Sequence, residues 1–181
     1  AASTAFSASA RGIKLVDLRL VMPGADLVAQ TELQLPKPLL NLELRGSLLD
    51  LETLIQDVEL PKGEGALPAW LLSWPEELPP ANISCDLERF QAGDVTLTDM
   101  RLQATTSPGQ LQLQLERASF LDGELQAGAS ASKGQLYVKT SLQQADANAL
   151  STMLFGAPHM QGIITLHGEA SSQGETAQEL W

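Results

Sequence analysis

The chain of 181 residues has few of the residues that usually carry chemistry or cross-link a small fold. The single cysteine, Cys85, excludes an internal disulfide, and its place beside Ile83 and Leu87 in an alternating run predicts a buried structural thiol. The two histidines, His159 and His167, have no carboxylate or cysteine at ligand spacing, so we expect no metal site. No G-x-S-x-G, G-x-G-x-x-G or phosphate-loop motif occurs, and we expect no catalytic residues and no cofactor. We therefore expect a protein that is not an enzyme.

Basic residues and long apolar runs are also scarce. Only 11 Lys and Arg stand against 22 Asp and Glu, and the net charge of −11 argues against nucleic acid and against electrostatic adhesion to anionic lipid headgroups. Aromatic residues make up 4% of a chain that is 44% hydrophobic, so the expected interior is aliphatic. No window reaches the roughly 18 apolar residues of a membrane span. No basic-then-apolar signal opens the chain, and we expect any signal or anchor to lie outside it.

Alternating apolar and polar residues are what the chain has in quantity. Six successive runs in its second half alternate with a period of two, which is typical of half-buried strands, and short Gly, Asp and Ser turns join them. The sequence predicts a mainly β fold, an elongated, curled antiparallel sheet of meander topology and groove-like or sandwich-like form, with two or three short helices. The six predicted strands span Ile83–Leu87, Asp94–Ala104, Gln110–Leu115, Ala118–Ala131, Gly134–Leu142 and Gly162–Ala170.

The phase of the alternation carries further information. It slips at Leu15–Val16 and again near Asp99, and each slip predicts a β-bulge. The run from Gln110 to Leu115 places leucine on one face and glutamine on the other. The sequence therefore predicts a sheet with one dry side and one wet side.

A strand–helix layout occurs twice. A helix expected over residues 147–155 follows a strand, has Asp146 as its N-cap and ends at a glycine, after which the alternation resumes. A helix expected over Ser47–Val58 also follows a strand, and Asp50 stands 96 positions before Asp146. Two copies of one layout suggest repeated units.

The distribution of proline divides the chain. Half of the ten prolines fall within twenty residues. We expect a β unit over 1–60 that ends in a short helix, a Pro/Gly-rich connector over 61–82, and a β meander with one helix over 83–181, all within one continuous body. Trp70 and Trp74 in the connector either cover an open end of the core or form an exposed patch that meets a partner.

The aliphatic face is the candidate site. About nine strands are expected to carry it, and only two or three short helices are available to cover it. A β-sandwich would hide this face, whereas a curled, gutter-like sheet would hold an acyl chain. The candidate residues for a lipid groove are Val95, Leu97, Leu102, Leu111, Leu113, Leu115, Leu125, Val138, Ile164 and Leu166.

The order of elements in the last hundred or so residues resembles the carboxy-terminal periplasmic region of the AsmA family. The resemblance rests on FQAGDVTLTDMRLQA, GQLQLQLERASFLDGELQAGASAS, LYVKTSLQQADANALSTML and GIITLHGEASSQG, taken in this order. The family pattern has an aromatic-x-x-Gly corner, matched by Phe120 and Gly123. It continues with a D-x-x-x-L helix, matched by Asp146 and Leu150, and a glycine-bounded strand that begins at Gly162. The first sixty residues look like the preceding AsmA-type unit.

The resemblance implies a periplasmic segment of a protein anchored in the inner membrane of a Gram-negative cell, with the anchor outside this chain. The family looks related to bridge-like lipid transporters, so phospholipid acyl chains and other segments of the parent chain are the expected partners. Its implied role is support of outer-membrane assembly and phospholipid transport between the two membranes. The alternative is a periplasmic scaffold that carries no lipid and docks partners through its sheet edges or through Trp70 and Trp74. The envelope partners are not identified by the sequence.

Overall fold

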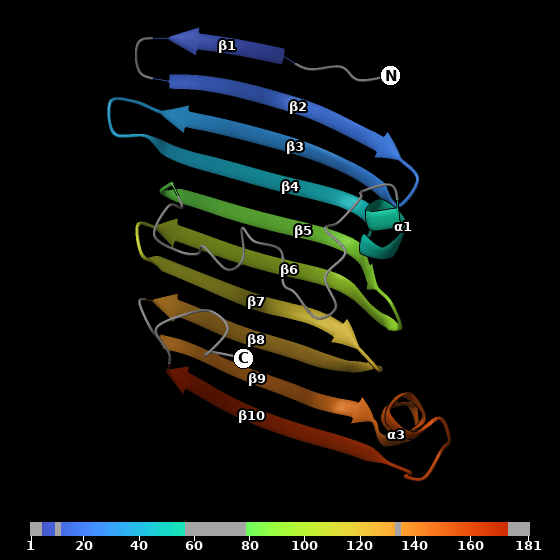
Figure 1. Cartoon of the computed structure of the whole chain (residues 1–181). Helices are drawn as coiled ribbons and strands as arrows, with labels where there is room; N and C mark the ends of the chain where they lie inside the picture. Colours follow the sequence, from blue (N-terminus) through green and yellow to red (C-terminus); the bar gives the residue numbers. More distant parts are fainter. Residues whose placement is uncertain (1–4, 10–11, 57–78, 133–134, 174–181) are drawn as a thin grey trace.

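The computed structural model describes residues 5–9, 12–56, 79–132 and 135–173, and these residues form a single ten-stranded sheet (Figure 1). The strands lie side by side in sequence order, and β1 and β10 are the two edges, so the sheet is not closed. The fold is mainly β and is an elongated, curled sheet, as predicted. The strands are β1 (Ala5–Ser9), β2 (Gly12–Met22), β3 (Ala25–Gln34), β4 (Leu39–Asp50), β5 (Ala81–Ala92), β6 (Val95–Ser107), β7 (Gln110–Phe120), β8 (Gly123–Ser132), β9 (Gln135–Asp146) and β10 (Ile163–Gln173). The described helices are α1 (Leu51–Gln56) and α3 (Ala147–Phe155).

The sheet is mixed, where the sequence predicted a purely antiparallel one. Eight of the nine neighbouring pairs are antiparallel, but β4 and β5 run parallel, with Leu40 opposite Ala81 and Asp50 opposite Gln91. A parallel pair needs a connection of a dozen or more residues, and the chain between α1 and β5 is long enough to supply it. Since no second sheet occurs among the described strands, the form is groove-like rather than sandwich-like.

One sheet therefore joins both predicted β units. The strands of the first unit meet those of the second where β4 pairs with β5. Strand β5 already begins at Ala81, two residues inside the predicted connector. The remainder of the connector lies largely outside the described residues.

Both bulges predicted from slips in phase are confirmed. On β2 the register with β3 shifts between Leu15 and Leu18, and Asp17 adopts a positive φ of 57°. On β6 the register with β7 shifts between Thr98 and Arg101, and Asp99 has φ of 51°. Each bulge returns the apolar residues of its strand to one face of the sheet.

Two predicted elements are divided differently in the structure, and the strand predicted over Ile83–Leu87 is longer, spanning Ala81–Ala92. The strand predicted over Ala118–Ala131 is divided, because the chain turns at Leu121 and Asp122, and Ala118 belongs to β7. The helix predicted from Ser47 begins at Leu51, since residues 47–50 extend β4, where Leu48 and Leu49 pair with β3 and Leu49 and Asp50 pair with β5. Hydrogen bonding along two neighbouring strands overrides the helical spacing of these four residues.

The two helices begin alike, as the repeated layout predicts. The side chain of Asp146 accepts a hydrogen bond from the backbone N–H of Asn148 at 2.8 Å, and Gly156 closes α3 with φ of 73°. The side chain of Asp50 accepts from the backbone N–H groups of Glu52 and Thr53 at 3.0 and 3.2 Å. In both units a strand therefore ends at an aspartate that caps the following helix.

The Asp50 cap is expected to make the stability of the fold depend on pH in the acid range. The Thr53 hydroxyl donates to the Asp50 carboxylate at 2.8 Å, and this bond, with the backbone N–H groups, lowers the pKa of Asp50. A lowered pKa in the folded state means that the stabilisation is present above about pH 4 and is lost as the pH falls through the folded-state pKa. Asp50→Ala should lower the urea midpoint at neutral pH, and the difference from the native chain should shrink as the pH falls through the lowered folded-state pKa of Asp50.

Asp50→Asn is the matched control for this cap, because its amide oxygen accepts the same backbone N–H groups without a charge. It should restore part of the midpoint lost in the alanine variant and show no titration. An equal loss at neutral and acid pH in Asp50→Ala would mean that the charge contributes nothing.

The core lies on one face of the central strands. Its buried cluster contains Leu87, which is 1% exposed, and Cys85, which is buried as predicted. Burial raises the pKa of the Cys85 thiol, so it stays protonated and inert. The full cluster is Cys85, Leu87, Leu97, Met100, Leu115 and Ala118.

Candidate functional site

The two faces of the sheet differ in chemistry along every central strand. On β7, residues Leu111, Leu113 and Leu115 point to one side, and the glutamines between them point to the other. Directly paired residues of neighbouring strands share a face, so the register extends this division across the sheet. We call the leucine side the apolar face and the glutamine side the polar face.

The register brings most of the predicted groove residues onto the apolar face. Leu102 pairs with Leu115, and Leu113 is joined through Ala129 to Val138. These residues therefore form cross-strand rows.

The remaining candidates join the same face at its margins. Leu111 alternates with Leu113, and Leu125 is joined through Leu142 to Leu166. Ile164 pairs with the fully buried Ala145.

Leu97 and Val95 reach the apolar face through the bulge at Asp99. Leu97 belongs to the buried cluster with Met100, and Val95, two residues earlier, has the same orientation as Leu97. All ten candidates thus share one face, although they differ in burial. Leu97, Leu111 and Leu115 are buried, five others are half-buried, and Val95 and Leu166 are exposed at 38% and 43%.

The apolar face continues into the first half of the chain, where the sequence predicted no groove residues. Four residues of β2 pair with the apolar face of β3 and are each 39–47% exposed. Their alternation is visible in the sequence, and it is the signal that identifies them as part of this face. The four residues are Ile13, Leu18, Leu20 and Met22.

Ion pairs lie on the polar face. Arg19 lies 3.4 Å from Asp26, and the Arg101 guanidinium lies 3.3 Å from the Asp86 carboxylate. Arg45 pairs with Glu43 in the same way. All these side chains are well exposed, so each pair contributes little to stability, but together they keep this face hydrated.

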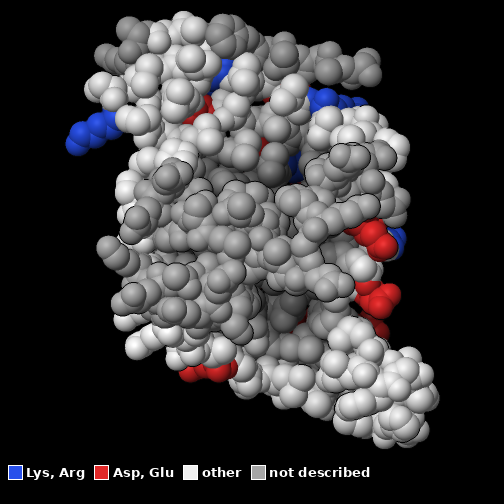
Figure 2. All heavy atoms as spheres, viewed as in Figure 1, with Lys and Arg blue, Asp and Glu red and all other residues white. Residues whose placement is uncertain are grey.

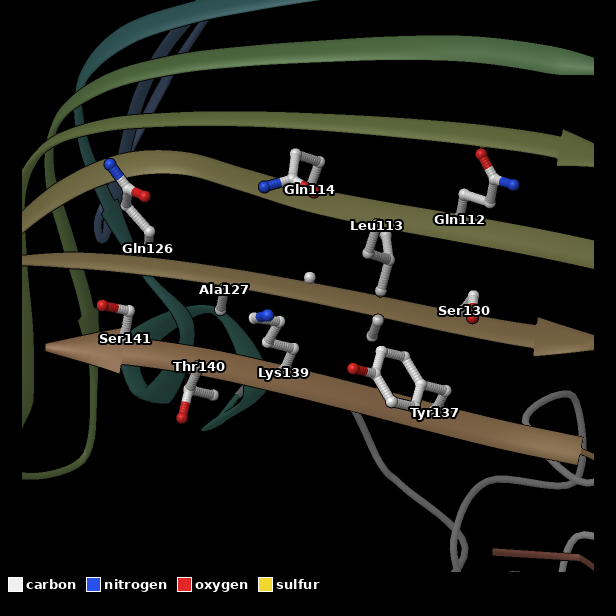
Figure 3. Close-up of a pocket in the computed structure, with 12 residues that line it drawn as sticks. Gln112, Leu113, Gln114, Gln126, Ala127, Ser130, Tyr137, Lys139, Thr140 and Ser141 are labelled. Atoms are coloured by element: carbon white, nitrogen blue, oxygen red, sulfur yellow. The ribbon is translucent and has the colours of Figure 1, made fainter. Parts of the chain in front are cut away.

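A hollow of about 370 Å³ lies on the polar face over β7, β8 and β9 (Figure 3). Gly128 lies between Gln114 and Lys139 in the register, and its missing side chain deepens the hollow. Lys139 lies 3.0 Å from the Glu169 carboxylate, whose hydrogen bond and charge raise the pKa of Lys139. Because the lining holds no histidine, cysteine or carboxylate, it offers no general base at neutral pH.

Other candidate features give no site. Trp70 and Trp74 lie outside the described residues. His167 is exposed on the polar face, opposite Ser141, as the alternation predicts. Within residues 5–9, 12–56, 79–132 and 135–173, no three metal-ligating side chains gather, and no helix is long and apolar enough to cross a membrane.

Comparisons with known proteins add no relative. Neither protein-family models, nor curated proteins, nor solved structures gave a match to the chain. The resemblance to the AsmA family therefore stays a prediction. Among the described residues, the apolar face carries all ten predicted groove residues.

Proposed function

We propose that the chain is a non-enzymatic segment of an AsmA-like protein that binds phospholipid acyl chains on its apolar face. One observation carries the proposal, namely that a single aliphatic face continues across the strands of an open sheet and keeps part of its surface accessible. A large contiguous apolar patch that stays exposed on a folded protein is typical of a protein, membrane or ligand-binding surface, whereas single exposed apolar residues are not. An aliphatic surface without clustered charges suits hydrocarbon better than a polar ligand.

The dimensions of the face agree with this ligand. Ten strands at the usual spacing extend the sheet by about 43 Å. An acyl chain fills about half of the roughly 30 Å hydrocarbon core of a bilayer, so the face is long enough for one or more such chains. The polar face stays in water, which is the arrangement that a soluble carrier of lipid needs.

The cellular role proposed for the segment follows the family resemblance. In this proposal the segment lies in the periplasm, within a protein anchored in the inner membrane. It supports outer-membrane assembly by providing part of a path for phospholipid between the two membranes.

Acyl-chain binding can be tested with the purified chain. Leu113→Asp with Val138→Asp places two carboxylates in one row of the apolar face, and we expect at least about tenfold weaker binding of a fluorescent fatty acid. The control, Gln112→Asp with Ser141→Asp, adds the same charge to the polar face of the same strands and should bind as the native chain does. Native mass spectrometry and lipid extraction then report whether phospholipid co-purifies.

The folded state of each variant is checked by far-ultraviolet circular dichroism. A native chain that neither retains phospholipid nor takes up the probe would refute the proposal. Equal loss in the apolar-face variant and the polar-face control would assign the effect to net charge.

A scaffold without lipid is the second candidate function, and the open edges of the sheet favour it. Strand β10 has 11 residues, and no other described strand pairs with its outer edge. An unpaired edge can accept a strand from a partner by β-augmentation. A lipid-free chain that binds an envelope protein would support this function instead.

A further inference from the structure

One corner of the sheet presents large apolar side chains to solvent. Leu154 and Phe155 at the end of α3 are 59% and 65% exposed, and Ile163 at the start of β10 is 78% exposed. From Ala147 to Gly168 the chain has no Asp, Glu, Lys or Arg, the longest such run in the sequence. Figure 2 shows this corner, at the lower right, as an uncharged projection. We call residues 147–163 the α3 corner.

Hydrogen bonds hold the α3 corner in one shape. The Ser151 hydroxyl is fully buried and accepts hydrogen bonds from the backbone N–H groups of His159 and Met160 at 3.0 and 3.4 Å. The N–H of Ala147 donates to the carbonyl of Gly162 at 3.0 Å, so the two ends of the corner are tied together. A projection with these backbone groups already paired enters a water-poor medium at a low desolvation cost.

We propose that the α3 corner inserts Leu154 and Phe155 into the boundary between headgroups and acyl chains of a zwitterionic bilayer. The corner is a projection rather than a groove, and a soft interface accepts a projection without a matching pocket. No charge has to be desolvated in the corner, whereas the net charge of −11 opposes docking on anionic headgroups.

The position of the α3 corner links it to the apolar face. Ile163 directly precedes Ile164, which lies on that face together with Leu166. Insertion of the corner brings one end of the apolar face to the membrane surface, where an acyl chain leaves the bilayer. This last link rests on the proposed function, whereas the insertion itself rests on the corner alone.

Flotation with phosphatidylcholine vesicles tests the insertion. The native chain should float with the vesicles, and Leu154→Glu with Phe155→Glu should reduce the bound fraction at least about tenfold. The control, Gln110→Glu with Gln112→Glu, adds the same charge to exposed positions of β7 and should float as the native chain does. Ile163→Ser repeats the test outside the helix and should also weaken flotation.

The outcomes separate the corner from the proposed function. Flotation lost in the corner variant, with uptake of the soluble fatty-acid probe unchanged, supports insertion and leaves acyl binding intact. A native chain that floats but takes up no probe supports insertion and removes the proposed function. Insertion is overturned if the native chain does not float, or if the corner variant floats equally well. It is also overturned if the only difference is that the native chain sediments as a dimer and the corner variant as a monomer. The corner would then bind a second copy of the chain.

Discussion

Replacement of Leu87 by alanine is expected to lower the free energy of unfolding by about 2–5 kcal/mol. Leu87 is 1% exposed at the centre of the sheet, opposite Met100 on one side and Gly46 on the other. Since glycine offers no side chain that could move into the space, truncation leaves a cavity that the neighbours fill only in part. Urea denaturation measures the loss directly. The melting temperature should fall by about 2–4 °C for each kcal/mol.

Leu20 provides a matched control on the same face. It is 47% exposed on β2, so Leu20→Ala removes the same atoms from a site that is already in contact with water, and it should cost less than about 1 kcal/mol. A chain in which both substitutions cost the same would have no buried centre on the apolar face. The contrast also shows which part of the face is core and which part is available to a ligand.

The fold could be predicted from the sequence wherever the signal was local. Alternation identified the strands, and a change of its phase located the bulges at Asp17 and Asp99, because apolar residues stood on both sides of each slip. The register shifts between Gly46 and Leu48 and between Leu115 and Ala118 escaped prediction, and so did a bulge at Gln144 with φ of 56°. The Gln144 bulge lies in a polar stretch, where no apolar phase reveals a slip.

Features that depend on distant parts of the chain could not be predicted. The direction of β5 relative to β4 depends on the path of the chain between them. Parallel and antiparallel neighbours can show the same alternation of apolar and polar residues, so the alternation does not reveal the direction. The start of α1 was misplaced because residues 47–50 have helical spacing, whereas Leu48 and Leu49 pair with β3 and Leu49 and Asp50 pair with β5. Tertiary pairing decides such cases, and local propensity does not.

The sequence predicted which residues share the apolar face, but not which of them are exposed to solvent. The strand register places the ten candidates on one face, as the phase of their alternation predicts. Their exposure nevertheless ranges from buried Leu97 to Leu166, which is 43% exposed. Phase shows which side of the sheet a residue occupies, whereas exposure depends on everything packed above it. The exposed residues of the α3 corner escaped for the same reason, since Leu154 carries the helical spacing of a buried residue.

The close approach of other backbone atoms to Gly123 explains why this glycine of β8 is required, whereas Gly128 on the same strand is not. A Cβ at Gly123 would lie 2.5 Å from the carbonyl oxygen of Gln143 and 2.7 Å from the amide nitrogen of Ala145. These are backbone atoms at the Gln144 bulge, and the carbonyl of Leu121 beside them accepts the N–H of Asp146 at 2.9 Å. The turn between β7 and β8 thus packs directly against the strand that leads into α3.

Gly123→Ala should therefore destabilise the chain by roughly 1–3 kcal/mol, at the upper end of that range, because backbone atoms cannot rotate away from the added methyl group. Gly128→Ala on the same strand is the control. Its Cβ would come closer than 3.9 Å only to the side-chain oxygen of Gln114, at 3.1 Å, and a flexible glutamine can move. Gly128→Ala should change the urea midpoint little or raise it slightly, since alanine restricts the unfolded chain. Equal effects of the two substitutions would contradict the close approach at Gly123 and with it the position of the bulge that leads β9 into the α3 corner.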